Sequence, residues 1–177
     1  MAVQLDVFPA ASAALLLDED YGLFLLDAVH RARRRVLATQ FLVELRPEFD
    51  GERFVQMLCR GLAEASWRGV DVRIVLSRFV ADPGLDVNGI ARRWLQARGV
   101  PVRGYRPRPG SRREQLHTKL VVVDDDLGIV SSHNWTPGAF AANREAALAV
   151  RSREVAGRLA EAFEGYWEVA ADGADGG

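Results

Sequence analysis

Cysteine is nearly absent from this sequence of 177 residues, which contains a single one at position 59. A lone cysteine excludes a disulfide framework within the chain, and it excludes a zinc site built from clustered cysteines. The residue lies in a stretch whose apolar positions have helical spacing. We therefore expect Cys59 to be a small buried side chain.

Long apolar runs and a charge imbalance are also missing. No stretch approaches the roughly 18–20 apolar residues that cross a bilayer, so we expect no membrane span. The N-terminal apolar run has no basic residue before it and ends in acids, unlike a secretory signal, and this favours a cytoplasmic protein. The net charge is −1, which argues against a protein that coats nucleic acid generally.

Lysine occurs once, at position 119, whereas the other 22 of the 23 basic residues are arginines. The sequence thus uses arginine for positive charge everywhere except at one position. The arginines cluster in two places, and the second cluster directly precedes the segment that contains the lysine. The members of these clusters are Arg31, Arg33, Arg34 and Arg35, and then Arg103, Arg106, Arg108, Arg112 and Arg113.

The composition is that of a globular domain. Hydrophobic residues make up 49% of the chain and charged residues 27%, which is enough apolar material for one domain with its own core. We expect a single domain over residues 1–170. The small and acidic residues 171–177 predict a flexible tail.

Apolar periodicity predicts a chain that alternates between strands and helices. We expect strands at residues 3–8, 36–43, 70–76, 100–105, 117–123, 129–132 and 145–150. Capping signals and helical spacing predict helices at 18–35, 50–67, 88–98 and 152–169. Proline and glycine predict loops at 77–89, 106–114 and 134–142. This order favours an α/β fold with a mixed sheet flanked by helices.

Side chains with catalytic chemistry gather around one predicted hairpin. His117 and Lys119 are two positions apart, so on a strand they would share a face. Ser132 and Asn134 would share a face at the end of the next strand. If the two strands pair through the acidic turn that begins at Asp124, an imidazole, an ammonium and a carboxamide meet around one point. Such a set suits an anionic tetrahedral group, because it combines a nucleophile with donors for oxygen atoms.

The same stretch resembles the signature of the phospholipase D superfamily. That signature is His, any residue, Lys, four residues, Asp, six residues, and Gly-Ser-any-Asn, and the spacing from His117 to Asn134 fits it throughout. One departure is Ser131, which stands where the family usually has glycine. The order of strands and helices also resembles the family over roughly residues 35–169, and the resemblance implies the family's sandwich, a mixed sheet with helices on both faces.

The resemblance implies a phosphodiesterase with a phosphohistidine intermediate. The family builds one active site from two motifs, and this chain has one, so it is similar to the short bacterial endonucleases that form homodimers. In those members a downstream glutamate hydrogen-bonds the nucleophilic histidine and orients it, and Glu145 stands where that glutamate is expected. The implied catalytic residues are His117, Lys119, Asn134, Glu145, Asp124 and Ser132, with no metal and no cofactor.

The sequence leaves three functions open. A nuclease is favoured, with DNA preferred over RNA, because the loop that contains Arg106, Arg108, Arg112 and Arg113 could bind a sugar-phosphate backbone. A phospholipase D or phosphatidyltransferase acting on lipids is the second. The third is a binding or regulatory component of a larger DNA-handling or phage-defence assembly.

Overall fold

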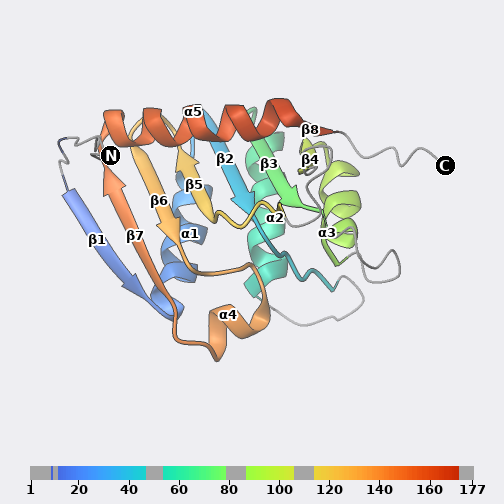
Figure 1. Cartoon of the computed structure of the whole chain (residues 1–177), viewed down its shortest axis with the longest axis horizontal. Helices are drawn as coiled ribbons and strands as arrows, with labels where there is room; N and C mark the ends of the chain where they lie inside the picture. Colours follow the sequence, from blue (N-terminus) through green and yellow to red (C-terminus); the bar gives the residue numbers. More distant parts are fainter. Residues whose placement is uncertain (1–8, 10–11, 47–53, 79–86, 106–113, 172–177) are drawn as a thin grey trace.

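A mixed sheet of eight strands organises the chain. The computed structural model describes residues 9, 12–46, 54–78, 87–105 and 114–171. The strands lie in the order β1-β7-β6-β5-β2-β3-β4-β8. They are β1 (Ser12–Leu17), β2 (Arg35–Gln40), β3 (Asp71–Ser77), β4 (Val102–Tyr105), β5 (Leu120–Val123), β6 (Leu127–Ser131), β7 (Ala146–Arg151) and β8 (Ala170–Ala171) (Figure 1). The helices are α1 (Glu19–Arg31), α2 (Phe54–Trp67), α3 (Val87–Gln96), α4 (Pro137–Ala141) and α5 (Arg153–Val169).

The sheet combines two kinds of pairing. β2, β3 and β4 are parallel to one another, and α2 and α3 connect them as crossover helices. β5 pairs antiparallel with β2, and β6, β7 and β1 follow as antiparallel neighbours. The expected mixed sheet is therefore confirmed.

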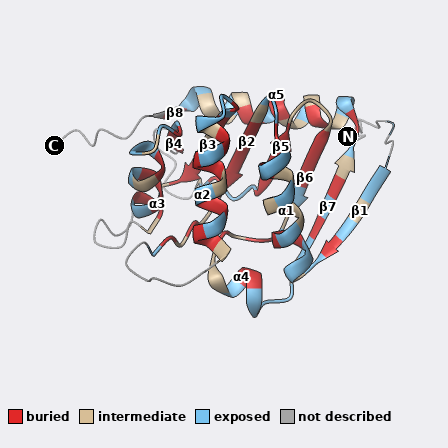
Figure 2. Ribbon diagram, turned by 180° about the vertical axis from the view of Figure 1, so that it is seen from behind, coloured by how far each residue is buried: buried red, intermediate tan, exposed pale blue. Residues whose placement is uncertain are grey.

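Helices cover both faces of the sheet, as expected. α5 lies across one face, and α1, α2 and α3 lie on the other (Figures 1 and 2). Each face has its own buried cluster, centred on Leu58, Leu62 and Ile74 on one side and on Val122 and Phe163 on the other. β5 is buried on both faces, which explains why its sequence is a continuous apolar run and does not alternate.

The C-terminal helix α5 follows its sequence signals closely. Ser152 is the N-cap, and its side chain accepts a hydrogen bond from Val155 N. α5 packs closely on β6 because the residue beneath it is Gly128, where a Cβ would lie 2.7 Å from Leu159 Cδ1. The helix thereby covers one face of the sheet over β5 and β6.

Several boundaries differ from the sequence-based expectations. The expected strand at 3–8 lies outside the described residues, and β1 is formed by Ser12–Leu17. α1 ends at Arg31, because Asp124 binds the backbone of the residues that follow. α4 forms within an expected loop, where the Thr136 side chain caps it and Pro137 begins it. Ala171, expected in the tail, pairs with Gly104 in β8, and residues 172–177 lie outside the described part.

Candidate active site

The two halves of the motif meet at one end of the β5–β6 hairpin. β5 and β6 pair in antiparallel register with Leu120 opposite Val130, and Ser131 N donates to Lys119 O at 3.0 Å. This register brings the residues before β5 beside those after β6, as the sequence predicted. The strand itself begins at Leu120, so His117 precedes the regular strand in which it was expected.

His117 and Lys119 form the centre of the site. Lys119 Nζ donates to the carbonyl oxygen of His117 at 2.9 Å and lies 3.5 Å from its Nδ1. The imidazole is exposed, whereas Lys119 is 7% exposed. Burial lowers the pKa of Lys119, and the charge of Glu145 opposes that shift. An exposed imidazole therefore lies beside an ammonium group that is fixed by its hydrogen bond to the His117 carbonyl.

Phe41, directly after β2, forms the apolar wall of this centre. Its ring centroid lies 4.5 Å from that of His117 at an interplanar angle of 58°, and Lys119 Nζ lies 5.4 Å from it. Contact with an aromatic face favours the cationic form of the lysine. The sequence predicts for Phe41 only a place in a buried strand, because its contact with His117 depends on the pairing of β2 with β5.

Glu145, just before β7, closes the site from the side. Its carboxylate accepts hydrogen bonds from Ser132 Oγ and, at 3.1 Å, from Asn143 Nδ2. Burial alone would raise the pKa of Glu145, but these two bonds and the charges of His133 and Lys119 bring it below its ordinary value. The expected direct bond from Glu145 to His117 is absent between these two described residues, so the expectation is corrected. The Glu145 carboxylate accepts a hydrogen bond from Ser132 Oγ and none from His117.

Unsatisfied polar atoms gather at the same end of the sheet. Among the described residues, the buried side-chain atoms without a hydrogen-bond partner are Asn134 Oδ1, His133 Nδ1 and both amide atoms of Gln40. Asn134 is half-buried, and Gln40 and His133 are fully buried. Leaving such atoms unpaired costs stability. Their concentration beside Lys119 distinguishes this end of the sheet from an ordinary apolar core.

Asp124 lies at the other end of β5, and its assignment among the catalytic residues is corrected. It stands in the turn before β6 with φ 53°. Its carboxylate accepts backbone hydrogen bonds from Arg33 N at 3.0 Å, from Arg34 N at 2.7 Å and from Arg35 N at 3.3 Å. Asp124 therefore holds the start of β2 against the hairpin turn, one strand length away from His117.

Three further expectations concern the arginine loop, a metal site and a membrane span. Arg106, Arg108, Arg112 and Arg113 lie outside the described residues. Within the described ranges, no three His, Cys, Asp or Glu side chains gather as ligands for a metal ion. The described helices include none that is long and apolar enough to cross a bilayer.

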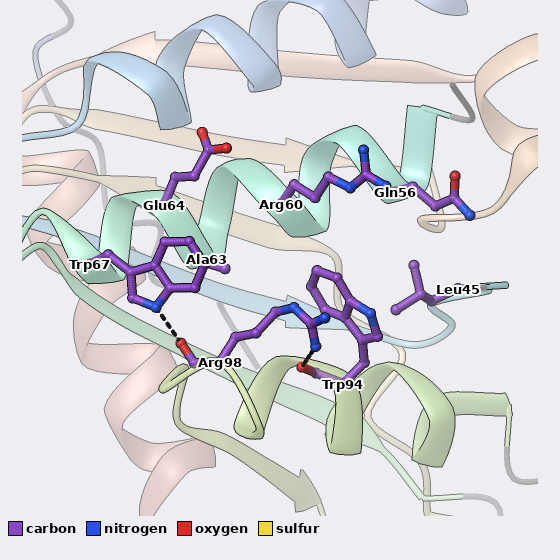
Figure 3. A pocket seen from close by; sticks show the side chains of 8 residues that line it. All are labelled: Leu45, Gln56, Arg60, Ala63, Glu64, Trp67, Trp94 and Arg98. Carbon is purple, nitrogen blue, oxygen red and sulfur yellow. Dashed lines mark hydrogen bonds between the residues drawn. The ribbon is translucent and has the colours of Figure 1, made fainter. Parts of the chain in front are cut away.

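A separate pocket of about 460 Å³ lies between α2 and α3 and contains none of the motif residues (Figure 3). Trp67 Nε1 donates to Arg98 O at 3.0 Å, and the Arg98 guanidinium lies 3.6 Å from the ring centroid of Trp94. These lining groups bind one another. The pocket is therefore a gap between two packed helices, and the chemistry belongs to the motif end of the sheet.

Comparisons with known proteins agree with the motif. Residues 25–167 match the family model described as cardiolipin synthase, PLD-like domain. Cardiolipin synthase A of Pseudomonas putida is 33% identical over 158 residues, which cover 87% of this chain and 30% of that protein. The mitochondrial cardiolipin hydrolase of the dog is 30% identical over 102 residues, covering 57% of this chain and 36% of that protein. The chain thus spans about a third of the length of these relatives.

Two solved structures share the fold over nearly their whole length. The phospholipase D family member Nuc from Salmonella typhimurium superimposes with a TM-score of 0.72 at 20% identity, covering 92% of this chain and 99% of that one. NucT from Helicobacter pylori gives the same TM-score at 16% identity, with the same coverage. The chain therefore has the same fold as these two solved chains.

Proposed function

The chain belongs to the phospholipase D superfamily, and from this premise we propose that it is a metal-independent endonuclease that works through a phosphohistidine on His117. The observation that carries the proposal is the meeting of His117, Lys119 and Asn134 at one end of the β5–β6 hairpin. An exposed imidazole beside a buried ammonium group has the chemistry of a nucleophile and an oxyanion donor.

The reaction proceeds in two displacements. A ring nitrogen of His117 attacks phosphorus, and the bond from phosphorus to the leaving oxygen breaks. The leaving oxygen keeps the electron pair of that bond and accepts a proton from His117 of a second copy. Water then attacks the phosphohistidine and gives a proton to that second histidine. The nitrogen–phosphorus bond breaks, and both histidines return to their starting state.

The neighbouring groups stabilise the charge that builds on phosphorus. Lys119 and the amide of Asn134 hold the phosphoryl oxygens, a role for which a compact ammonium suits a crowded tetrahedral group better than a wide guanidinium fork. Glu145 fixes Ser132 and the segment before β7, and its charge attracts Lys119. The ammonium groups of two copies supply the charge that a metal ion supplies in other phosphodiesterases.

An exposed apolar sheet face beside the site supports a homodimer. Leu15 of β1, Leu148 of β7 and Val130 of β6 are direct cross-strand neighbours, and they are 67%, 49% and 51% exposed. Leu17 extends this row toward the site, where Ser132 N donates to Ala146 O. A contiguous apolar patch of this kind marks an interface. Because the chain holds one motif, a second copy on this face would complete the site.

Nucleic acid is the proposed substrate, with DNA favoured over RNA. The fold matches the solved chain of Nuc over 99% of its length, and this short architecture supports the proposal. The arginine loop at residues 106–113 precedes His117 and supplies positive charge for a phosphate backbone. A lipid phosphodiesterase is the second candidate, favoured by the 33% identity to cardiolipin synthase A.

One assay separates these functions. The purified protein and a His117→Asn variant are incubated with labelled DNA, RNA and anionic phospholipid vesicles in the presence of EDTA. We expect DNA cleavage that survives the chelator and disappears in the variant. Cleavage of phospholipid alone would establish the lipid enzyme, and activity restored only by Mg²⁺ would contradict the proposed mechanism.

A further inference from the structure

We propose that Asp18, at the junction of β1 and α1, is a positioning residue of this active site; the inference rests on the proposed phosphodiesterase function. Asp18 and Glu145 are joined by a reciprocal pair of hydrogen bonds. Asp18 N donates to Glu145 O at 3.0 Å, and Glu145 N donates to Asp18 Oδ1 at 2.9 Å. Arg144 Nη1 donates to the second carboxylate oxygen at 2.8 Å. The backbone that carries the Glu145 carboxylate is thereby fixed on both sides.

The same residue also holds the other half of the site. His133 Nε2 donates to the carbonyl oxygen of Asp18 at 2.9 Å, a direction that follows because a carbonyl oxygen only accepts. The His133 ring is fully buried and stacks on Tyr21 of α1, with centroids 4.3 Å apart. His133 lies between Ser132 and Asn134 in the motif. Asp18 therefore connects the segment after β6 with the segment before β7.

The backbone conformation of Asp18 is strained. Its φ is 48° and its ψ is −117°, a combination that strains a residue with a Cβ and that glycine adopts freely. Asp18 stands at the N-cap position of α1, where an aspartate usually accepts from the first turn, yet its side chain makes no such bond. The carboxylate is directed to Glu145 and Arg144 instead.

The charge of Asp18 fits this role. The hydrogen bond from the Glu145 backbone and the bond from Arg144 hold the pKa of Asp18 below its ordinary value. The carboxylate is therefore ionised at neutral pH, and both of its oxygens stay available as acceptors. Substrate and reacting atoms are not touched by Asp18, so its effect passes through Glu145, Ser132 and Asn134.

The test compares Asp18→Gly with Asp18→Asn, and uses Asp20→Asn, an exposed acid of the first turn of α1, as the matched control. Glycine relieves the backbone strain and removes the carboxylate, whereas asparagine keeps an acceptor oxygen for Glu145 N. We expect Asp18→Gly to keep its Tm within about 4 °C, because strain relief and the lost bonds oppose each other. Its kcat on the activated diester bis(p-nitrophenyl) phosphate should fall about tenfold or more at nearly constant KM, since a misplacement of about 1 Å can cost about 100-fold.

The variants are expected to separate stability from turnover. Asp18→Asn should recover most of the kcat, and Asp20→Asn should match the wild type. A kcat equal to the wild type in Asp18→Gly would overturn the proposal, since a residue that only shapes the turn is replaced by glycine without loss.

A crystal structure of Asp18→Gly distinguishes this failure from failure of the proposed function. We expect the Glu145 carboxylate to leave Ser132 in the variant. Retention of that contact would contradict the positioning role whatever the activity. If the wild type has no diesterase activity that depends on His117, the proposed function fails while the positioning of Glu145 is still decided by the structure.

Discussion

Asp124 and His117 belong to the same motif but work at opposite ends of one strand. The fixed spacing between them equals the length of β5 plus its flanking residues. The aspartate anchors the start of β2 to the hairpin turn through three backbone N–H groups. The position of Asp124 in the motif corresponds to the end of β5 that pairs with the start of β2. Its contacts are with backbone N–H groups, which a sequence pattern does not reveal.

Replacing Asp124 should therefore affect stability and leave catalysis intact. Asp124→Ala removes the hydrogen bonds that a charged carboxylate accepts. It also places alanine, whose side chain makes no hydrogen bond, in the left-handed backbone conformation at φ 53°. We expect a loss of about 2 kcal/mol in the free energy of unfolding, measured by urea denaturation, with a smaller loss for Asp124→Asn. The kcat of the folded fraction should stay near that of the wild type. Normal stability with a large loss of kcat would return Asp124 to the catalytic set.

The strands and helices of the centre of the sheet could be predicted from sequence because burial imposes a strong pattern there. β5 is apolar throughout since helices cover both of its faces, and the stripe of α5 follows Phe163 and its neighbours at helical spacing. α4 was missed because its five residues are too few for a period, although Thr136 and Pro137 supply the start signal. Edge strand β1 is a continuous apolar run after Ser12 (SAALLL), although it is largely exposed, so no alternation of apolar and polar residues identifies it as a strand.

The site could be predicted only as far as its local spacing reached. His117, Lys119 and Asn134 were found because the hairpin brings near neighbours in sequence together. Asp18 and Phe41 were not, because their contacts arise from strands and turns that are distant in the chain: His133 and its acceptor Asp18 are 115 positions apart. Nothing in the local sequence around Asp18 distinguishes it from an ordinary helix cap.

The exposed apolar row on β1, β7 and β6 is the proposed dimer interface, and a charge placed in it should separate the two copies. Leu148→Glu places a charge on a side chain that is 49% exposed in the single chain, so the fold should persist while the proposed dimer separates. Leu23→Glu on α1, at a position that is 64% exposed, is the control and should remain dimeric. Sedimentation and diesterase activity are measured together. A Leu148→Glu protein that is still dimeric, or a monomer that is fully active, would exclude this face as the interface.

On the scale of the whole molecule, we propose that the fold supplies half of an active site. The described residues place His117 just before the buried strand β5, and they leave the adjacent apolar row on β1, β7 and β6 exposed. A second copy would bring a second histidine for the leaving oxygen and a second ammonium for the phosphoryl group. Function in this account therefore depends on assembly as much as on the motif itself.

We expect His117 to become covalently bound to phosphorus during turnover. The protein is mixed with bis(p-nitrophenyl) phosphate, quenched in base during turnover, digested and analysed by mass spectrometry, with His117→Asn as the control. Attack on this diester expels one p-nitrophenolate, so we expect a base-stable, acid-labile p-nitrophenyl phosphoryl adduct on the peptide that contains His117, and neither adduct nor turnover in the variant. Turnover without an adduct on His117, together with near-normal activity of the variant, would contradict it.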